Sequence, residues 1–209
     1  MSLFVKLCGL RTPQDVEAAI AAEASAVGFV MTESPRRVSV AEAAHLRSLL
    51  PARILAVAVF HDPSRHLIEQ VQNEMAPDLF QAEPRVLQGL LPRSRILPVV
   101  AEGPDLAARA QSALEVTDAG WVLVDSSARG GTGRRVAWDD LVSLPSRSRL
   151  VLAGGLTPDN VAEAVLTVRP GGVDVSSGVE QAPGAKDHGL MREFVIAARS
   201  VEFQDEVTV

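Results

Sequence analysis

Two stretches of the chain, LAGGLTPDNV at 152–161 and VDVSSGVE at 173–180, decide the fold. Each is a short apolar run that ends in small residues, and about one strand–helix module separates them. Glycine lets the main chain approach an anion closely, and the start of a helix, here opened by Thr157-Pro158, offers unpaired N–H groups. In (β/α)8 barrels a phosphate commonly sits between the loops after strands seven and eight, so this pair predicts such a barrel.

The predicted phosphate site is formed by main-chain amides at the ends of these two runs. Ordinary tight turns between strands and helices also favour Gly and Ser, so either loop alone is weak evidence. Two neighbouring loops at this spacing favour a phosphate site over ordinary turns. The residues concerned are Gly154, Gly155, Ser176, Ser177 and Gly178.

The rest of the chain repeats the same pattern, with short β-like runs and amphipathic helical stretches alternating every ~20 to 30 residues. Eight strands favour a closed parallel barrel, a single α/β (β/α)8 TIM barrel, over an open doubly wound sheet. The fourth unit, 77–92, is short and interrupted by prolines. Strands are expected near 3–8, 26–31, 54–60, 77–81, 95–100, 121–125, 149–154 and 172–176, with helical stretches at 16–23, 40–50, 66–75, 105–115 and 160–168.

Length and composition predict one domain. A chain of 209 residues with 47% hydrophobic content can bury a full core, and no linker divides it. We expect a catalytic barrel domain over residues 1–200. The segment 201–209 lacks a helical stripe, and we expect it to be a frayed tail.

The net charge and the lack of targeting patterns exclude several classes of partner. The formal net charge of -6 argues against a nucleic-acid partner or an anionic membrane. No run reaches the roughly 18 apolar residues of a membrane span, and the start of the chain lacks the pattern of a signal peptide. A single cysteine excludes an internal disulfide and a thiolate zinc cluster. We therefore expect a cytoplasmic protein that binds a small molecule and no metal. Its oligomeric state cannot be read from these features, and a monomer or homodimer is expected.

Chemically useful side chains fall at the C-terminal ends of the predicted strands. Cys8 ends the first strand, Asp125 ends the sixth and Asp174 lies on the eighth. Arg36 follows the second strand in SPRRV. In a (β/α)8 barrel these positions converge on one mouth, where active sites are built.

Cys8 is a candidate base, although most free cysteines are small buried hydrophobes. Lys6 stands two residues earlier and faces the same side of the strand. Its charge favours the thiolate, so we expect the pKa of Cys8 to be lowered. Because strand eight closes onto strand one, Asp174 is the expected partner of Lys6.

Asp125 is a candidate acid because it follows the apolar run 121–124, and a carboxyl in such surroundings can hold a proton near neutral pH. A loop or helix cap is the alternative role. The following segment, SSARGGTGRR, carries Gly131 and two further glycines that would let it fold over a ligand; a flexible connection is the alternative. The planar guanidinium of Arg36 suits a carboxylate, but Arg37 is adjacent, and either could instead be a solvated loop charge.

These segments together resemble the phosphoribosylanthranilate isomerase family of tryptophan biosynthesis. The resemblance runs from Lys6 to about Phe194. It rests on KLCGL, SPRRV, the VD at 124–125 followed by GGTG and Trp138, LAGGLTPDNV, and DVSSGVE with GAKDH.

The resemblance implies an Amadori rearrangement of N-(5-phosphoribosyl)anthranilate to 1-(2-carboxyphenylamino)-1-deoxyribulose 5-phosphate. It implies that Cys8 is the general base, Asp125 the general acid and Arg36 the contact of the anthranilate carboxylate. Asp174 would hold the sugar, Gly131 would contact the substrate, and the glycine and serine amides would hold the phosphate. The chemistry agrees, since one proton must reach the ring oxygen and another must leave C2′, and no cofactor is needed.

One segment departs from the family pattern. After the fourth strand the family usually shows Gln-Leu-His-Gly, whereas this chain has Gln81, Ala82, Glu83 and Pro84. A carboxylate at Glu83 would repel the carboxylate of the substrate unless it were protonated or turned away. We therefore assign no ligand role to Glu83.

Three other functions share some of these features. A ribulose-phosphate epimerase is disfavoured because no histidine stands at a strand end with carboxylates as a metal ligand would; the four are His45, His61, His66 and His188. The histidine-pathway isomerase would use two aspartates, so Cys8 argues against it, although dual activity stays open. A non-catalytic phosphosugar-binding barrel would bind without turnover, and the presence of both Cys8 and Asp125 argues against it.

Overall fold

The computed structural model describes residues 3–87, 89–115, 117–118, 120–125, 138–142 and 147–201. Gly131 and the last eight residues of the expected tail, 202–209, lie outside the described residues. In the described part of the chain, no helix is both long and apolar enough to cross a membrane.

Eight parallel strands form a closed barrel in chain order, with the last strand hydrogen-bonded to the first. This confirms the predicted (β/α)8 fold. The strands are β1 (Phe4–Cys8), β2 (Ala26–Val30), β3 (Leu55–Val59), β4 (Leu79–Ala82), β5 (Ile96–Ala101), β6 (Val122–Asp125), β7 (Leu150–Leu152) and β8 (Gly172–Val175).

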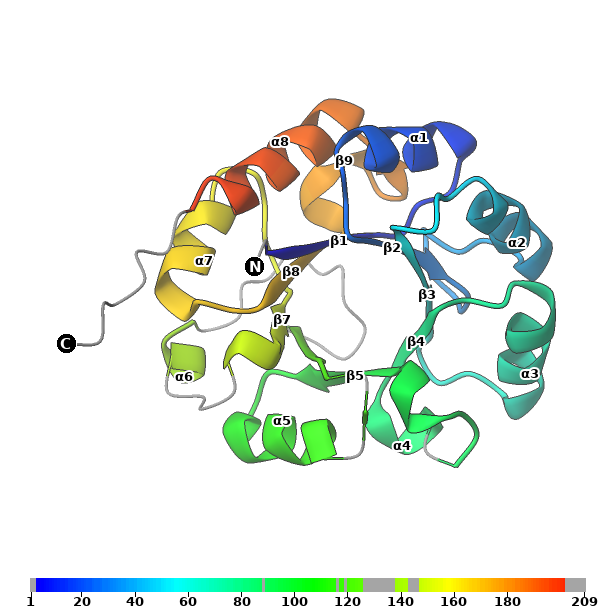
Figure 1. Ribbon diagram of the computed structural model, residues 1–209, viewed down its shortest axis with the longest axis horizontal. Coiled ribbons are helices and arrows are strands. Elements are labelled where there is room, and N and C mark those ends of the chain that lie inside the picture. Colours follow the sequence, from blue (N-terminus) through cyan, green and yellow to red (C-terminus); the bar gives the residue numbers. More distant parts are fainter. Residues whose placement is uncertain are drawn as a thin grey trace.

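Helices surround the barrel, and α8 packs between α7 and α1 (Figure 1). The ring of helices therefore closes next to the place where β8 pairs with β1. Four of the helices begin at a side chain that caps the first turn: Thr12, Ser39, Ser64 and Asp187. The helices are α1 (Pro13–Ala21), α2 (Val40–Ser48), α3 (Arg65–Glu74), α4 (Pro84–Leu87), α5 (Leu106–Glu115), α6 (Trp138–Val142), α7 (Val161–Val168) and α8 (His188–Arg199), with 3-10 turns at Arg93–Arg95, Arg147–Arg149 and Ser177–Val179.

The helical stretches named from the sequence did not include α4, α6 or α8, and one further feature was not expected at all. A short antiparallel hairpin, β9 (Glu180–Ala182) with β10 (Ala185–Lys186), leaves the barrel after β8. It leads directly into α8, which completes the eighth strand–helix unit. The fourth unit is short, as the prolines indicate, and its helix spans only Pro84–Leu87.

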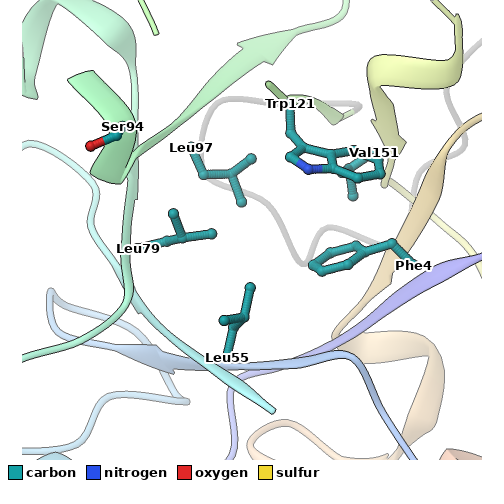
Figure 2. A pocket seen from close by; sticks show the side chains of 7 residues that line it. All are labelled: Phe4, Leu55, Leu79, Ser94, Leu97, Trp121 and Val151. Atoms are coloured by element: carbon teal, nitrogen blue, oxygen red, sulfur yellow. The ribbon is translucent and has the colours of Figure 1, made fainter. Parts of the chain in front are cut away.

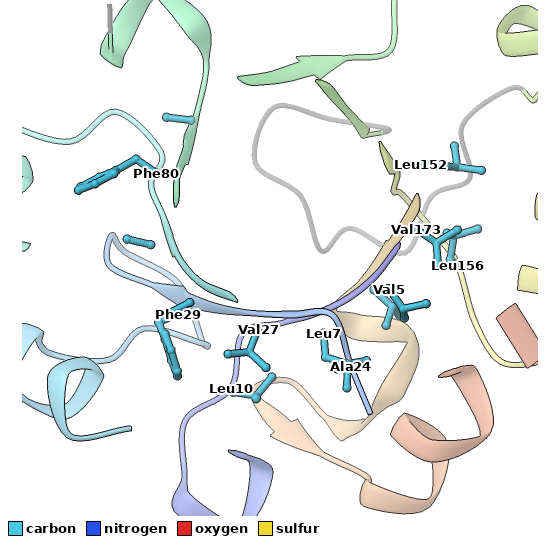
Figure 3. Packing of buried hydrophobic residues seen from close by; sticks show 14 of the residues in the cluster. Val5, Leu7, Leu10, Ala24, Val27, Phe29, Phe80, Leu152, Leu156 and Val173 are labelled. Atoms are coloured by element: carbon cyan, nitrogen blue, oxygen red, sulfur yellow. The ribbon is translucent and has the colours of Figure 1, made fainter. Parts of the chain in front are cut away.

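The strands pack on both faces, as their alternating residues require. Val5 and Leu7 on β1 belong to the large cluster between the barrel and the helices, and their side chains point away from the barrel axis (Figure 3). Phe4, Lys6 and Cys8 alternate with them and therefore face the interior. A second, smaller cluster fills that interior; it consists of Ala26, Val57, Leu97, Val99, Leu123, Val151 and Ala153.

The N-terminal end of the barrel encloses a cavity of about 120 Å³. The rings of Phe4 and Trp121 meet there with their centroids 5.2 Å apart (Figure 2). Apart from Ser94 the lining is apolar, and it contains no titratable side chain: Phe4, Leu55, Leu79, Ser94, Leu97, Trp121 and Val151. The titratable candidates lie toward the opposite end, at the C-terminal ends of the strands.

Leu7→Ala is expected to lower the free energy of unfolding by about 2–5 kcal/mol, because Leu7 is fully buried between β1 and the helices and its loss leaves a cavity. Urea unfolding monitored by circular dichroism measures the change. Leu166→Ala on α7 is the matched control, since Leu166 is 57% exposed, and its effect should stay within about 0.5 kcal/mol. Equal losses in the two variants would contradict this account of the core.

Candidate active site

A buried ion pair joins the first and last strands at the barrel interior. The register of β1 and β8 places Lys6 opposite Asp174. Lys6 is fully buried, and its Nζ donates a hydrogen bond of 2.7 Å to Oδ1 of Asp174. This confirms Asp174 as the partner of Lys6. Burial alone would lower the pKa of Lys6, but attraction to Asp174 and Cys8 outweighs it and raises the pKa.

Gly28 on β2 makes room for the sulfur of Cys8. The register of β1 and β2 places Gly28 opposite Cys8, and a Cβ on Gly28 would lie 2.7 Å from Sγ of Cys8 and 3.1 Å from Nζ of Lys6. The thiol and the ammonium therefore share the space that the missing side chain leaves. Cys8 is 6% exposed and belongs to neither apolar cluster of the described residues.

Burial raises the pKa of the Cys8 thiol above its ordinary value, so the expected lowering is wrong. Lys6 and Lys186 both favour the thiolate, whereas Asp174 disfavours it. Each lysine already has a carboxylate partner, Asp174 for Lys6 and Glu180 for Lys186. Their charge is therefore largely compensated, and it does not overcome the loss of hydration at the sulfur.

Asp125 and Asp174 line one depression together with both predicted phosphate loops. Asp125 ends β6, is 8% exposed and stands opposite Ala101 of β5. The structure thus brings together all five predicted phosphate-binding residues and both aspartates. The lining consists of Asp125, Gly154, Gly155, Leu156, Asp174, Val175, Ser176, Ser177 and Gly178.

The two loops need glycine for different reasons. Gly154 and Gly155 adopt φ values of +86° and +66°, which other residues rarely adopt. At Gly178 the reason is contact, because a Cβ would lie 1.8 Å from the carbonyl oxygen of Leu156 in the neighbouring loop. None of the hydrogen bonds among the described residues uses the N–H groups of Gly154, Gly155, Ser177 or Gly178. Among the described residues no acceptor competes with an anion for these amides.

Asn160 supports the first loop, a role that the sequence did not reveal. Its Oδ1 accepts a 2.9 Å hydrogen bond from the Thr157 amide, and its Nδ2 donates one of 3.0 Å to the carbonyl of Gly155. Asn160 is 4% exposed. The hydrogen bonds of the first turn start at Thr157, as the Thr-Pro pair indicates, and α7 itself begins at Val161.

Arg36, not Arg37, turns toward the mouth. Arg37 is exposed, whereas the Arg36 side chain is 12% exposed. Nε and Nη2 of Arg36 donate hydrogen bonds of 2.8 and 2.9 Å to the two carboxylate oxygens of Glu180. Lys186 donates a further 2.7 Å bond to Glu180. Sequence analysis gave Glu180 and Lys186 no role, although both lie in the motifs SSGVE and GAKDH.

Gly9 fixes the path of the Arg36 side chain. It follows β1 with φ +79°, and a Cβ there would lie 2.7 Å from Cδ of Arg36 and 3.2 Å from Oγ of Ser176. The hydroxyl of Ser176 in turn donates a 3.2 Å bond to the carbonyl of Cys8. The end of the first strand, the arginine and the loop after β8 are therefore in direct contact.

Glu83, which stands where the family has histidine, pairs with Arg85 at 2.8 Å. Arg85 lies on α4 and its side chain is 81% exposed, so Glu83 has a solvent-exposed partner. Gln81, which matches the family segment, is 6% exposed, and its Oε1 accepts no hydrogen bond from any residue that the structure describes. In the described part of the chain no group of three or more His, Cys, Asp or Glu side chains is placed to hold a metal ion.

Comparison with known proteins identifies the family. The family model described as N-(5'phosphoribosyl)anthranilate (PRA) isomerase matches residues 5–197. The chain belongs to the PRA isomerase family. A PRA isomerase of Bradyrhizobium sp. (strain ORS 278) is 41% identical over 218 residues, which covers 97% of this chain and 98% of the relative.

Solved PRA isomerase structures share the fold. The Thermotoga maritima structure has a TM-score of 0.78 and 32% identity, and the match covers 95% of this chain and 100% of that one. A PRA isomerase in complex with reduced 1-(o-carboxyphenylamino)-1-deoxyribulose 5-phosphate has a TM-score of 0.75 and 31% identity, with the same coverage.

Gly28→Ala is expected to lower kcat by at least about tenfold with the fold intact, because the added methyl group displaces the sulfur of Cys8 or the ammonium of Lys6. Steady-state kinetics with PRA as substrate measure the effect. Gly189→Ala near the start of α8 is the matched control, because its Cβ would meet only the tip of Asp187. Full activity of the Gly28 variant would show that the sulfur position is not restricted by β2.

The Cys8 thiol is expected to titrate at higher pH in the folded protein than in the unfolded protein, because burial opposes the thiolate. Ultraviolet absorbance of the thiolate, followed during a pH titration, measures this directly, since the chain has one cysteine and no tyrosine. The protein unfolded in urea and the variant Cys8→Ser provide the reference and the blank. A lower midpoint in the folded protein would mean that the two lysines outweigh burial.

Proposed function

We propose that this protein converts N-(5-phosphoribosyl)anthranilate to 1-(2-carboxyphenylamino)-1-deoxyribulose 5-phosphate, with Cys8 as general base and Asp125 as general acid. The observation that carries this proposal is the depression lined by Asp125, Asp174 and both phosphate loops, at the same end of the barrel where Cys8 ends β1. An isomerase acting on a phosphorylated sugar needs an anion anchor, an acid and a base within one site.

The phosphate anchors the substrate at the amides of Gly154, Gly155, Ser177 and Gly178, with Ser176 beside them. Asp125 then gives a proton to the ring oxygen, which breaks the bond to C1′ and leaves a positively charged imine. The thiolate of Cys8 removes the proton from C2′, and an enolamine forms. A proton then reaches C1′ while the C2′ hydroxyl loses one, which gives the ketone. The overall change is an internal oxidation–reduction between C1′ and C2′, driven by proton transfers.

Lys6 and Lys186 support the base during the reaction. Both favour the thiolate of Cys8, although burial keeps its pKa high. A base of high pKa accepts a proton readily once it is ionised, so a small thiolate fraction is compatible with catalysis. Asp174, held by Lys6, would hold the sugar.

The proposal includes two further substrate contacts. Arg36 would bind the anthranilate carboxylate, and Gly131, which follows β6 in the sequence, would contact the substrate. We further propose that residues 1–200 form one catalytic domain with 201–209 outside it. The protein would act in the cytoplasm as a monomer or homodimer, without nucleic acid, metal or cofactor.

Cys8→Ala and Asp125→Ala are each expected to lower kcat by about 10² to 10⁴, because each removes one of the two proton-transfer groups. The assay follows the loss of anthranilate-type fluorescence after purified protein is mixed with freshly generated PRA. Circular dichroism shows whether each variant keeps the fold. Turnover near that of the unaltered protein in both variants would refute the assignment.

A further inference from the structure

Glu180 lies between two cations at the edge of the site. Its side chain is 4% exposed, and its two oxygens accept the hydrogen bonds from Nε and Nη2 of Arg36. Oε1 also accepts from Nζ of Lys186, which is fully buried, and Oε2 accepts a 3.2 Å bond from the amide of Gly184. A buried carboxylate with this many donors has one orientation.

The hairpin β9–β10 holds this carboxylate. Glu180 and Lys186 stand opposite each other in its register, so both side chains project from one face. Gly184 in the turn has φ +80°, and a Cβ there would lie 2.4 Å from the carbonyl oxygen of Pro35. The hairpin is therefore packed directly against the loop that carries Arg36.

Lys186 links the same carboxylate to the phosphate loop. Its Nζ donates a 2.9 Å hydrogen bond to the carbonyl of Ser176, in addition to its bond with Glu180. Ser176 lines the depression that contains Asp125 and Asp174. The loop after β2 and the loop after β8 are thus connected through two buried side chains.

The net charge of this cluster favours binding of an anion. Two basic side chains, Arg36 and Lys186, face one carboxylate, which leaves one net positive charge while Lys186 is protonated. Burial lowers the pKa of Lys186, and its hydrogen bond to Glu180 opposes that lowering. Burial would raise the pKa of Glu180, but hydrogen bonds and attraction from Arg36 and Lys186 outweigh it and lower the pKa, so Glu180 remains ionised at neutral pH. A partly buried net positive charge beside the mouth favours binding of an anion.

A guanidinium can bind one carboxylate along its Nε–Nη2 edge and another along its Nη1–Nη2 edge. Glu180 occupies the first edge. No described residue accepts a hydrogen bond from Nη1. Glu180 therefore holds the arginine in one orientation and leaves the second edge for a ligand.

We propose that Glu180 is a positioning residue that turns the Nη1–Nη2 edge of Arg36 toward the carboxylate of the substrate, with Lys186 coupling this contact to the phosphate loop. The inference rests on the proposed function, in which Arg36 binds that carboxylate. The hairpin β9–β10 would then contribute to substrate specificity, in addition to connecting β8 with α8.

The test is Glu180→Gln, measured with two ligands. One is the reduced product analogue that carries the carboxylate, and the other is the same compound made from aniline, which lacks it. We expect the variant to bind the first ligand about tenfold more weakly, because a neutral amide holds Arg36 less firmly than a bidentate carboxylate. Binding of the second ligand should change by less than about twofold. With PRA as substrate, KM should rise more than kcat falls.

Three further variants complete the design. Glu193→Gln, at an exposed position of α8, is the matched control and should bind both ligands normally. Glu180→Asp keeps the negative charge on a shorter side chain. It should lose less affinity for the first ligand than Glu180→Gln does, and none for the second. Arg36→Met removes the contact itself and should abolish the preference for the carboxylate.

The outcomes separate the inference from the proposed function. If Glu180→Gln weakens both ligands equally, or weakens neither, Glu180 does not position Arg36, and the inference fails. If Arg36→Met keeps the preference for the carboxylate, the proposed role of Arg36 fails as well. If Arg36→Met loses the preference and Glu180→Gln keeps it, the inference alone is wrong. Thermal unfolding of each variant shows that the comparison is made between folded proteins.

Discussion

The ion pair between Lys6 and Asp174 is the interaction on which the rest of the site depends. It joins the first and last strands of the barrel across 168 residues of sequence. Removing one partner of such a buried pair costs about 3–5 kcal/mol, because the other charge is left unpaired, whereas the pair itself adds little net stability. The pair is therefore better explained by function than by stability. Its ammonium lies beside the sulfur of Cys8, and its carboxylate lines the depression between the phosphate loops.

The two ends of the barrel interior are lined by different kinds of side chain. At the N-terminal end the cavity of about 120 Å³ is almost entirely apolar. At the C-terminal end, Lys6, Asp125, Asp174 and Lys186 are buried polar side chains. Burying these groups is costly unless each has a partner. Lys6 has its partner, Asp174, on β8, and Lys186 has its partner, Glu180, on β9. The parallel barrel gathers the C-terminal ends of all its strands at one end, where such partners meet.

The elements of the fold could be predicted from local features of the chain. Alternating apolar residues, caps such as Thr12 and Ser39, and the Gly-rich ends of two strands depend on residues a few positions apart. The predicted strands 26–31 and 54–60 therefore lie within one residue of β2 and β3 at each end. The predicted strand 149–154 was too long, because Gly154 and Gly155 adopt positive φ and leave the sheet. The hairpin β9–β10 was missed because its strands have only three and two residues, with no apolar alternation to reveal them.

By itself the sequence determined the barrel, and it placed the glycines, the serines and the candidate reactive side chains at strand ends, because strand periodicity, helix caps and residue type are local properties. Only the tertiary structure decided the state of those side chains. The direction of the Cys8 pKa shift depends on burial by the whole barrel and on two lysines that are already paired. The orientation of Arg36 depends on a carboxylate 144 residues away. Desolvation and charge pairing act between groups that are close in space. Only the fold determines which residues distant in sequence become neighbours.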